Sequence, residues 1–322
     1  MSTVSFFVTV QDGIQLVEKR MRAQADEKDH SDLSAALDHL LASGGKRIRP
    51  TLVFLVGHML GAPEDKLVTL GAAVEMLHTA TLVHDDLIDG SLLRRGTPTL
   101  NARWSPAATV LTGDFLFARA AKLAAEADHL PLMKGFAETL AVIVSGELTQ
   151  LFTARGSISF DNYYQRIYAK TASLFEMSTR SAAMVSPASE DVIEAIRLFG
   201  YELGIAFQIM DDVLDFTGDQ AAVGKPVGSD LLQGLVTLPA LYYLENHPED
   251  DDVRLLKDGG WGNRDRMERL VQSIRMSDSI QQAVGEARQR VDRALALIDH
   301  FHPSVEKSAL AELALYIVDR NF

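Results

Sequence analysis

The chain has 322 residues, of which 47% are hydrophobic, and it contains no cysteine. The lack of cysteine excludes disulfides and thiol catalysis, and a net charge of -13 argues against nucleic acid as the main partner. Residues 1–8 carry neither a basic segment nor a long apolar run, so no secretory signal is predicted. We find no apolar run long and charge-free enough to span a bilayer, and we expect a cytoplasmic protein.

Apolar residues recur at helical spacing along most of the chain. Ser31 is predicted to cap a helix that ends at Gly44 and Gly45, and Pro50 opens a second helix that covers residues 51–60. Further helices are predicted at 64–89, 105–125, 131–152, 160–185, 189–216, 230–246, 279–301 and 304–319, with loops at 96–99, 217–228 and 258–263. Strand alternation, short repeats and Pro/Ser-rich linkers are absent. We therefore predict one all-α domain over residues 1–322, a helix bundle with its site in the core.

Three aspartates close the helix predicted at 64–89. Asp85 and Asp89 are four residues apart and share one helix face, whereas Asp86 is rotated from them by about 100°. Like charges at this spacing destabilise a bare helix, and lone charges at the end of an apolar helix are costly. A hard divalent cation bound through oxygen would offset both effects.

The same spacing returns at Asp211, Asp212 and Asp215, again after an apolar helical run. One such cluster could equally be a solvated acidic helix end. Two clusters of identical spacing favour a metal site, and if the two helices face each other, six carboxylates frame one cavity. Oxygen-only ligands suit magnesium, which usually shares its coordination with substrate phosphates.

Basic residues lie beside the predicted turns. The stretch Gly44-Gly45-Lys46-Arg47-Ile48-Arg49-Pro50 places cations before a helix N-terminus, which attracts anions. Taken alone, such a loop is usually just solvated. A second basic pair, Arg94-Arg95, follows the first aspartate cluster, and the planar guanidinium fork binds phosphate oxygens bidentately.

These motifs carry a family resemblance. Two DDxxD motifs, the first followed by Arg-Arg-Gly, and the GGKRIRP stretch resemble the trans-isoprenyl diphosphate synthases, or polyprenyl synthetases. The resemblance runs from about Gly44 to Pro239 and more weakly to the C-terminus. It implies a mostly antiparallel bundle around a deep central cavity, commonly a homodimer. It also implies a prenyltransferase that joins an allylic diphosphate head-to-tail to isopentenyl diphosphate.

The resemblance also implies the roles of individual residues. It implies about three Mg²⁺ per site, with Mn²⁺ as a substitute. The implied metal ligands are Asp85, Asp89 and Asp211, with Asp86, Asp212 and Asp215 behind them. The implied isopentenyl diphosphate contacts are Lys46, Arg49, His78 and Arg95. The implied allylic diphosphate contacts are Arg94, Lys170, Thr171, Gln208 and Lys225.

Two histidines and one leucine are considered separately, because a structural role is common for such histidines and the leucine departs from the family pattern. Without the resemblance, a lone histidine on an apolar helix such as His78 is more often a core residue, and His84 keeps that reading. Family members often carry a lysine where this chain has Leu235, in Gly234-Leu235-Val236-Thr237-Leu238-Pro239. The missing cation is expected to weaken pyrophosphate binding without abolishing activity, and it leaves a changed substrate preference open.

Product length is predicted from the helix that ends in Asp85. The growing tail would run beside Leu77, Ala80 and Thr81. Small Ala80 stands where short-chain relatives tend to carry an aromatic residue, and the first motif lacks a two-residue insertion found in some short-chain members. Both imply a product above C20, which the resemblance implies is all-trans. Such a greasy product could bring the protein into peripheral contact with a membrane surface for product release. Candidates for a deeper floor are Phe115, Phe117 and Phe152, although core packing is the commoner role of each.

Three alternatives stay open at this point. A terpene cyclase of the same fold class also uses aspartate-rich metal sites, but it needs no second diphosphate site such as the GGKRIRP stretch and Arg94-Arg95 suggest. A non-catalytic subunit of a heteromeric synthase is disfavoured by the six intact aspartates. A metal phosphohydrolase reading of His84-Asp85 needs further histidine ligands, which cannot be placed.

Overall fold

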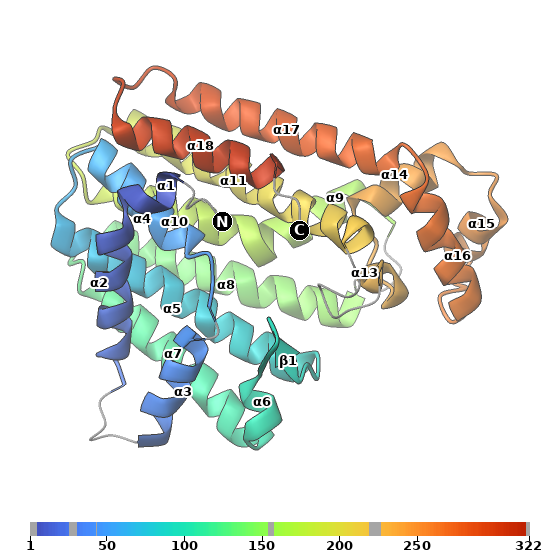
Figure 1. Cartoon of the computed structure of the whole chain (residues 1–322), viewed down its shortest axis with the longest axis horizontal. Coiled ribbons are helices and arrows are strands. Elements are labelled where there is room, and N and C mark those ends of the chain that lie inside the picture. Colours follow the sequence, from blue (N-terminus) through green and yellow to red (C-terminus); the bar gives the residue numbers. More distant parts are fainter. Residues whose placement is uncertain (1–4, 26–30, 43, 154–157, 219–226, 320–322) are drawn as a thin grey trace. The chain divides into compact units, whose positions relative to one another are not determined.

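Helices make up almost all of the described chain. In the computed structural model, the residues described are 5–25, 31–42, 44–153, 158–218 and 227–319. Within these ranges the elements are helices, apart from one pair of two-residue strands (Figure 1). The all-α prediction is confirmed. The chain divides into two compact units, one of residues 1–139, 174–197 and 300–312, the other of residues 140–173, 198–299 and 313–322. The single domain over 1–322 stays a prediction.

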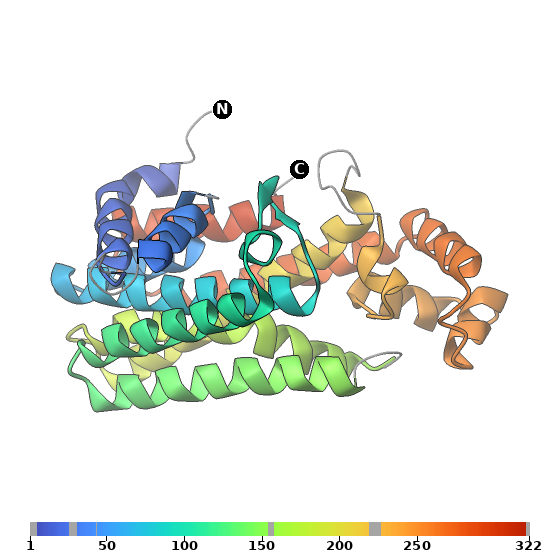
Figure 2. The same ribbon diagram turned by 90° about the horizontal axis from the view of Figure 1, so that it is seen from below.

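The first unit is built around one apolar helix, α5 (Glu64–Ile88), whose side chains are mostly buried. Helix α7 (Pro106–Ala125) runs beside it in both views (Figures 1 and 2). The other elements are α1 (Ser5–Thr9), α2 (Gln11–Arg22), α3 (Ser31–Ala42), α4 (Ile48–Met59), α6 (Leu100–Arg103), α10 (Ser173–Met184), β1 (Leu93–Arg94) and β2 (Thr97–Pro98). By length and composition α5 could cross a membrane, but 67% of its most apolar window is buried inside the protein, as in a core helix.

The end of α5 is set by a glycine. Gly90 has a φ of +62° and follows the C-cap Asp89. The amide of Gly90 donates to Leu87 O and that of Ser91 to Asp86 O, which is the Schellman pattern. A hairpin then pairs Leu93 with Pro98 and Arg94 with Thr97, where a plain loop was predicted. Its two connecting residues, Arg95 (φ +53°) and Gly96 (φ +75°), both have positive φ, as a type I′ turn requires.

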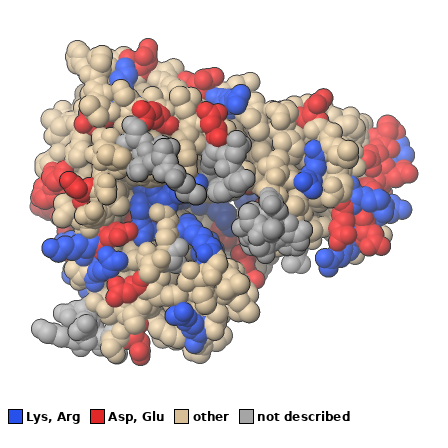
Figure 3. Space-filling model, viewed as in Figure 1, with Lys and Arg blue, Asp and Glu red and all other residues tan. Residues whose placement is uncertain are grey.

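The second unit carries the other helices. Helices α8 (Leu130–Thr153), α11 (Glu190–Thr217) and α18 (Val305–Asp319) have residues in both units, as does α10, whose first residue Ser173 belongs to the second unit. Wholly within the second unit lie α9 (Phe160–Ile167), a π-helix η1 (Tyr168–Ala172), α13 (Ser229–Leu232), α14 (Leu238–Asn246), α15 (Asp251–Lys257), α16 (Arg264–Arg275) and α17 (Ser279–Ile298). Acidic and basic side chains alternate over α15 and α16 (Figure 3), in ion pairs such as Arg269–Asp252.

Two predicted helices are wrong in part. The helix predicted at 160–185 is interrupted by η1. The spacing of apolar residues does not predict the wider turn of a π-helix. The helix predicted at 230–246 is split into α13 and α14, because Gly234 takes a φ of +87° and Pro239 stands in the first turn of α14. Helices α15 and α16 had no predicted counterpart.

The π-helix packs closely against α8 at one glycine. A Cβ added to Gly146 of α8 would lie 2.4 Å from the Cβ of Ala169 in η1, which is far inside van der Waals contact. Gly146 is therefore required by packing, and its lack of a side chain lets η1 approach α8.

A pair of helical glycines tests this approach. A Cβ added to Gly285 of α17 would have no neighbouring atom within 4 Å. Gly285→Ala should therefore stabilise the protein by about 0.4–1 kcal/mol, because alanine lowers the conformational entropy of the unfolded chain. Gly146→Ala restricts the unfolded chain in the same way, but its methyl group would clash with Ala169. Such overpacking typically costs about 1–3 kcal/mol. We expect opposite shifts of the denaturation midpoint in guanidinium chloride. Equal shifts for the two variants would contradict the close approach.

Candidate active site

The first aspartate cluster keeps one carboxylate for an internal ion pair. Arg94 Nε lies 3.0 and 3.1 Å from the two carboxylate oxygens of Asp86, and Nη2 lies 2.9 Å from Oδ1. Asp86 is buried, Asp85 is half-buried and Asp89 is exposed. The hairpin after α5 thus folds back and places Arg94 against the cluster.

Cations surround His78, which lies on α5 two turns before the aspartates. Burial lowers the pKa of His78 well below its usual value, and neighbouring positive charges lower it further. These charges belong to Arg49, Arg95, Arg94 and Arg47. At neutral pH the imidazole is therefore neutral and can accept as well as donate a hydrogen bond. The structure brings together three of the predicted isopentenyl diphosphate contacts, Arg49, His78 and Arg95.

Arg95 bridges the hairpin and the glycine loop. Its guanidinium donates to Gly44 O, and its Nη1 atom lies 3.0 Å from the position of a Cβ added to Gly45. Burial lowers the pKa of Arg95, and the charges of Arg94 and Arg47 lower it further. Lys46 is half-buried in the same loop. Crowding of like charges in a partly dry site favours binding of an anion.

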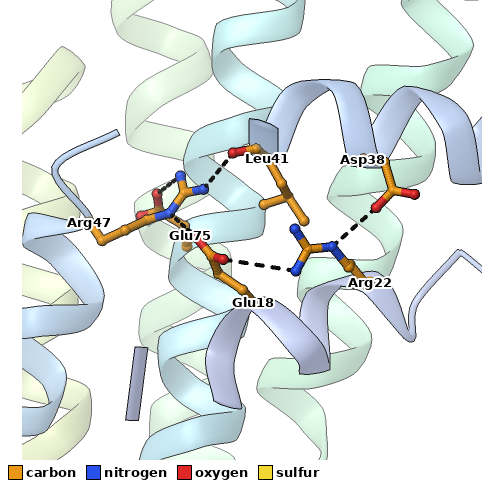
Figure 4. Close-up of polar contacts among 6 residues, drawn as sticks. All are labelled: Glu18, Arg22, Asp38, Leu41, Arg47 and Glu75. Atoms are coloured by element: carbon orange, nitrogen blue, oxygen red, sulfur yellow. Dashed lines mark hydrogen bonds and ion pairs between the residues drawn. The ribbon is translucent and has the colours of Figure 1, made fainter. Parts of the chain in front are cut away.

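Arg47 has a structural role that sequence reasoning missed. Its guanidinium donates to Glu75 Oε1 at 3.0 Å, to Glu18 Oε1 at 3.0 Å and to Leu41 O at 3.2 Å (Figure 4). Glu75 is 4% exposed and sits on α5, Glu18 is on α2 and Leu41 is on α3. Arg47 therefore ties three helices together just before α4. The only sequence signal was Glu75, a charge within the otherwise apolar run of α5.

The second aspartate cluster is held by neutral donors. Asp212 accepts from Gln208 Nε2 at 2.9 Å and from the hydroxyl of Tyr163 at 2.8 Å. Burial raises the pKa of Asp212 to about 7, and Asp230 adds to the rise while the two hydrogen bonds oppose it. Gln208 also accepts from the hydroxyl of Thr171 at 2.6 Å. Two predicted allylic contacts, Thr171 and Gln208, are thus linked to a buried carboxylate, and Tyr163 is a partner that the sequence did not reveal.

Asp215 binds the start of the next segment. Its Oδ1 accepts from the hydroxyl of Ser229 at 2.8 Å, and its Oδ2 accepts from the amide of Asp230 at 3.3 Å. The carboxylate thereby fixes the first turn of α13. Asp211 is half-buried on the same helix.

Lys170 lies in the π-helix and forms an ion pair. Its Nζ is 3.3 Å from Glu147 Oε1 on α8, and its side chain is 39% exposed. π-Helical turns occur frequently at functional sites, and here the irregular turn holds both residues of the predicted Lys170-Thr171 pair.

The remaining predicted residues are placed as follows. Leu77 and Ala80 are buried in α5, and Thr81 is half-buried with its hydroxyl donating to His78 O at 2.8 Å. Lys225 lies outside the described residues. Leu235 is half-buried between α13 and α14. Phe152 is 75% exposed, so core packing does not explain it.

The atoms that the predicted ligands offer indicate which metal they suit. Across the ranges that the structure describes, no three histidine or carboxylate side chains converge as a preformed metal site. Asp86 and Asp212 accept hydrogen bonds from Arg94, Gln208 and Tyr163. The predicted ligands Asp85, Asp89 and Asp211 are carboxylates, which bind a metal through oxygen. This chemistry fits magnesium better than a softer metal.

Comparison with known proteins identifies the family. The model of the family described as Polyprenyl synthetase matches residues 30–274 of this chain. The chain belongs to the polyprenyl synthetase family. It is a polyprenyl diphosphate synthase, and thus a trans-prenyltransferase, with the all-α isoprenoid synthase fold.

Similar proteins make the class more specific. The chain is 35% identical over 326 residues to heptaprenyl diphosphate synthase component 2 of Geobacillus stearothermophilus, with 100% of each chain covered. It resembles the crystal structure of heptaprenyl diphosphate synthase from Staphylococcus aureus, with a TM-score of 0.91, 35% identity, and 97% and 99% of the chains covered. It also resembles a polyprenyl synthase from Caulobacter crescentus complexed with calcium and isoprenyl diphosphate, with a TM-score of 0.90, 33% identity, and 98% and 97% covered.

The Arg47 contacts predict a large effect on stability. Arg47→Met leaves Glu75 buried without its cation, and breaking a buried pair typically costs about 3–5 kcal/mol. Arg47→Met combined with Glu75→Met should recover most of that loss, because no uncompensated charge remains. Arg22→Met is the control, since its pairs with Asp38 and Glu18 involve a half-exposed side chain and should contribute about 1 kcal/mol or less. Urea unfolding measures all three, and equal losses for Arg47→Met and Arg22→Met would contradict the argument.

Proposed function

We propose that this chain extends an allylic diphosphate by head-to-tail condensation with isopentenyl diphosphate, uses Mg²⁺, and releases an all-trans product longer than C20. The observation that carries the proposal is the group of arginines around His78, which lies two turns before a cluster of three aspartates on the same helix. Such a site offers cations for a diphosphate beside oxygen ligands for a metal. Family membership and the heptaprenyl synthases among the relatives support the reaction and the long product.

In this proposal, two groups of residues bind the two substrates. Isopentenyl diphosphate is bound by Lys46, Arg49, His78 and Arg95. The allylic diphosphate is bound by Arg94, Lys170, Thr171, Gln208 and Lys225. Arginine and lysine suit these tasks because charge-assisted hydrogen bonds to phosphate are stronger than neutral ones.

The metal is assigned to Asp85, Asp89 and Asp211. Magnesium, when bound, would stabilise negative charge on the diphosphate and so make the diphosphate a better leaving group. The calcium and isoprenyl diphosphate named for the Caulobacter crescentus enzyme support an oxygen-ligated cation here. Asp86 and Asp212 keep their internal partners and orient the ligands beside them.

The protein's own side chains carry the rest of the reaction. The allylic C–O bond breaks, its electron pair leaves on the diphosphate oxygen, and the arginines and lysine stabilise that charge. Apolar residues of α5, including Leu77 and Ala80, keep water from the allylic cation. The double bond of isopentenyl diphosphate attacks the cation, and a diphosphate oxygen accepts the proton that is then lost.

Carboxylate variants test the metal assignment. Asp89→Asn keeps size but removes charge, and we expect kcat to fall by about 10²–10³, as for removal of one charge-stabilising group. Asp251→Asn on α15 is the control, because that aspartate is 88% exposed and 3.8 Å from Arg254. The assay incubates each protein with Mg²⁺, isopentenyl diphosphate and C5, C10, C15 or C20 allylic diphosphates, and separates products by length.

The outcomes of that assay separate the proposals. Products longer than C20 from the wild type support the reaction, and an unchanged Asp89→Asn would overturn its metal role. A hydrocarbon formed without isopentenyl diphosphate would indicate a cyclase instead. If the wild type is inactive alone, Leu235 and the name "component 2" of one relative point to a second subunit, to be sought by co-purification.

Self-association is proposed from an exposed apolar stripe on α8. Val144, Leu148, Leu151 and Phe152 are 44, 50, 61 and 75% exposed and recur at the spacing of one helix face. Exposed apolar patches commonly mark protein interfaces. A homodimer of this chain would bury the stripe. We place the dimer in the cytoplasm, with peripheral membrane contact during product release.

A charge-insertion variant tests this assembly. Leu148→Lys combined with Leu151→Lys should convert a dimer into a monomer, because burying two lysines in an apolar interface is costly. Met276→Lys is the control, since this methionine is 90% exposed and lies outside the stripe. Sedimentation velocity gives the masses. A wild-type monomer, or a double variant that still dimerises, would contradict the assignment.

A further inference from the structure

A continuous chain of hydrogen bonds joins the π-helix to the second aspartate cluster. The hydroxyl of Thr171 donates to Gln208 Oε1 at 2.6 Å, Gln208 Nε2 donates to Asp212 Oδ1 at 2.9 Å, and the hydroxyl of Tyr163 donates to Asp212 Oδ2 at 2.8 Å. All four residues belong to the second unit. These side-chain hydrogen bonds therefore connect α11 both to α9 and to η1.

The chain has one consistent direction. Gln208 has one acceptor end and one donor end. Its oxygen accepts from the Thr171 hydroxyl, and its amide nitrogen donates to a carboxylate oxygen of Asp212. The other carboxylate oxygen accepts from Tyr163. Asp212 is thus the common acceptor, and the orientation of the Gln208 amide depends on where that carboxylate is held.

Tyr163 is the fixed end of this chain. Its side chain is 1% exposed, so it cannot contact a substrate. The Arg166 guanidinium lies over its ring, 5.6 Å from the centroid, and donates to Val236 O at 2.6 Å. The ring is therefore packed on one side by Arg166, which is anchored to the segment before α14. A buried, packed hydroxyl can orient a carboxylate with little motion of its own.

We propose that Tyr163 is a positioning residue for the allylic diphosphate. It acts through Asp212 and Gln208 on Thr171, and so sets the direction in which the Gln208 amide and the Thr171 hydroxyl are presented. This inference rests on the proposed function, which assigns the allylic diphosphate to Thr171 and Gln208. Tyr163 itself touches neither substrate nor metal.

Two adjacent tyrosines provide a matched test. Tyr163→Phe removes one hydroxyl and keeps the ring beneath Arg166. Tyr164→Phe also removes a hydroxyl that donates to a carboxylate, but that carboxylate is Glu286 of α17, which also accepts from Tyr242 and Arg290. Both variants lose a similar hydrogen bond from the same helix, and only Tyr163→Phe disturbs the chain to Thr171.

The expected result is a selective change in KM. Tyr163→Phe should raise KM for the allylic diphosphate about fivefold to tenfold, the loss expected for one ordinary hydrogen bond. KM for isopentenyl diphosphate and kcat should stay within about twofold of wild type, since a lost ground-state contact changes KM without kcat. Tyr164→Phe should leave both KM values unchanged, although its thermal midpoint falls as that of Tyr163→Phe does.

A second measurement tests the route through Asp212. Thr171→Val removes the far end of the chain, so Tyr163→Phe should raise the allylic KM less in the Thr171→Val protein than in wild type. Thr171→Ser keeps the hydroxyl and should restore the full effect. Fully multiplicative effects, equal changes in both KM values, or equal behaviour of Tyr163→Phe and Tyr164→Phe would overturn the inference. A wild type that stays inactive even with any co-purified subunit would instead overturn the proposed function.

Discussion

The buried ion pair of Arg47 with Glu75 is the contact on which the basic half of the site depends. Burial of two charges is costly unless each is paired and hydrogen-bonded, and here the guanidinium has Glu75, Glu18 and Leu41 O as acceptors. Arg47 has a φ of +46° and is the N-cap of α4. This change of backbone direction begins the helix. It leaves Lys46 in the loop before α4 and Arg49 in the first turn of that helix. A sequence stretch that reads as three equivalent cations thus contains one structural arginine between two candidate ligands.

The two aspartate clusters have the same spacing but different internal chemistry. In the first, Asp86 is neutralised by the guanidinium of Arg94. In the second, Asp212 accepts from two neutral donors, Gln208 and Tyr163, and burial raises its pKa to about 7. A full positive charge stabilises an ionised carboxylate far more than two neutral hydrogen bonds do. Identical letters in a motif therefore do not imply identical hydrogen-bond partners.

The sequence predicted most of the long helices and the motif positions because both depend on local spacing, although it missed α2, α15 and α16. Apolar periodicity located α5, and glycine and proline located its ends. The residues it missed make contacts between distant positions: Tyr163 meets Asp212 across 49 residues, and Arg47 meets Glu75 across 28. A π-helical turn at Lys170 has no periodic signature of its own. The break at Gly234 was hidden because a single glycine inside an apolar run is compatible with either a helix or a turn.

The ion pair between Arg94 and Asp86 orients Arg94 and leaves it able to bind a substrate. A guanidinium has five N–H groups, and two of its nitrogens, Nε and Nη2, face Asp86. The Nη1 edge remains for a phosphate oxygen, and the side chain is 36% exposed. The diphosphate binding that we propose for Arg94 would then need no exchange of the internal pair, because the direction of the guanidinium is already fixed. The entropy of ordering a long flexible side chain has then been lost on folding, before the substrate arrives.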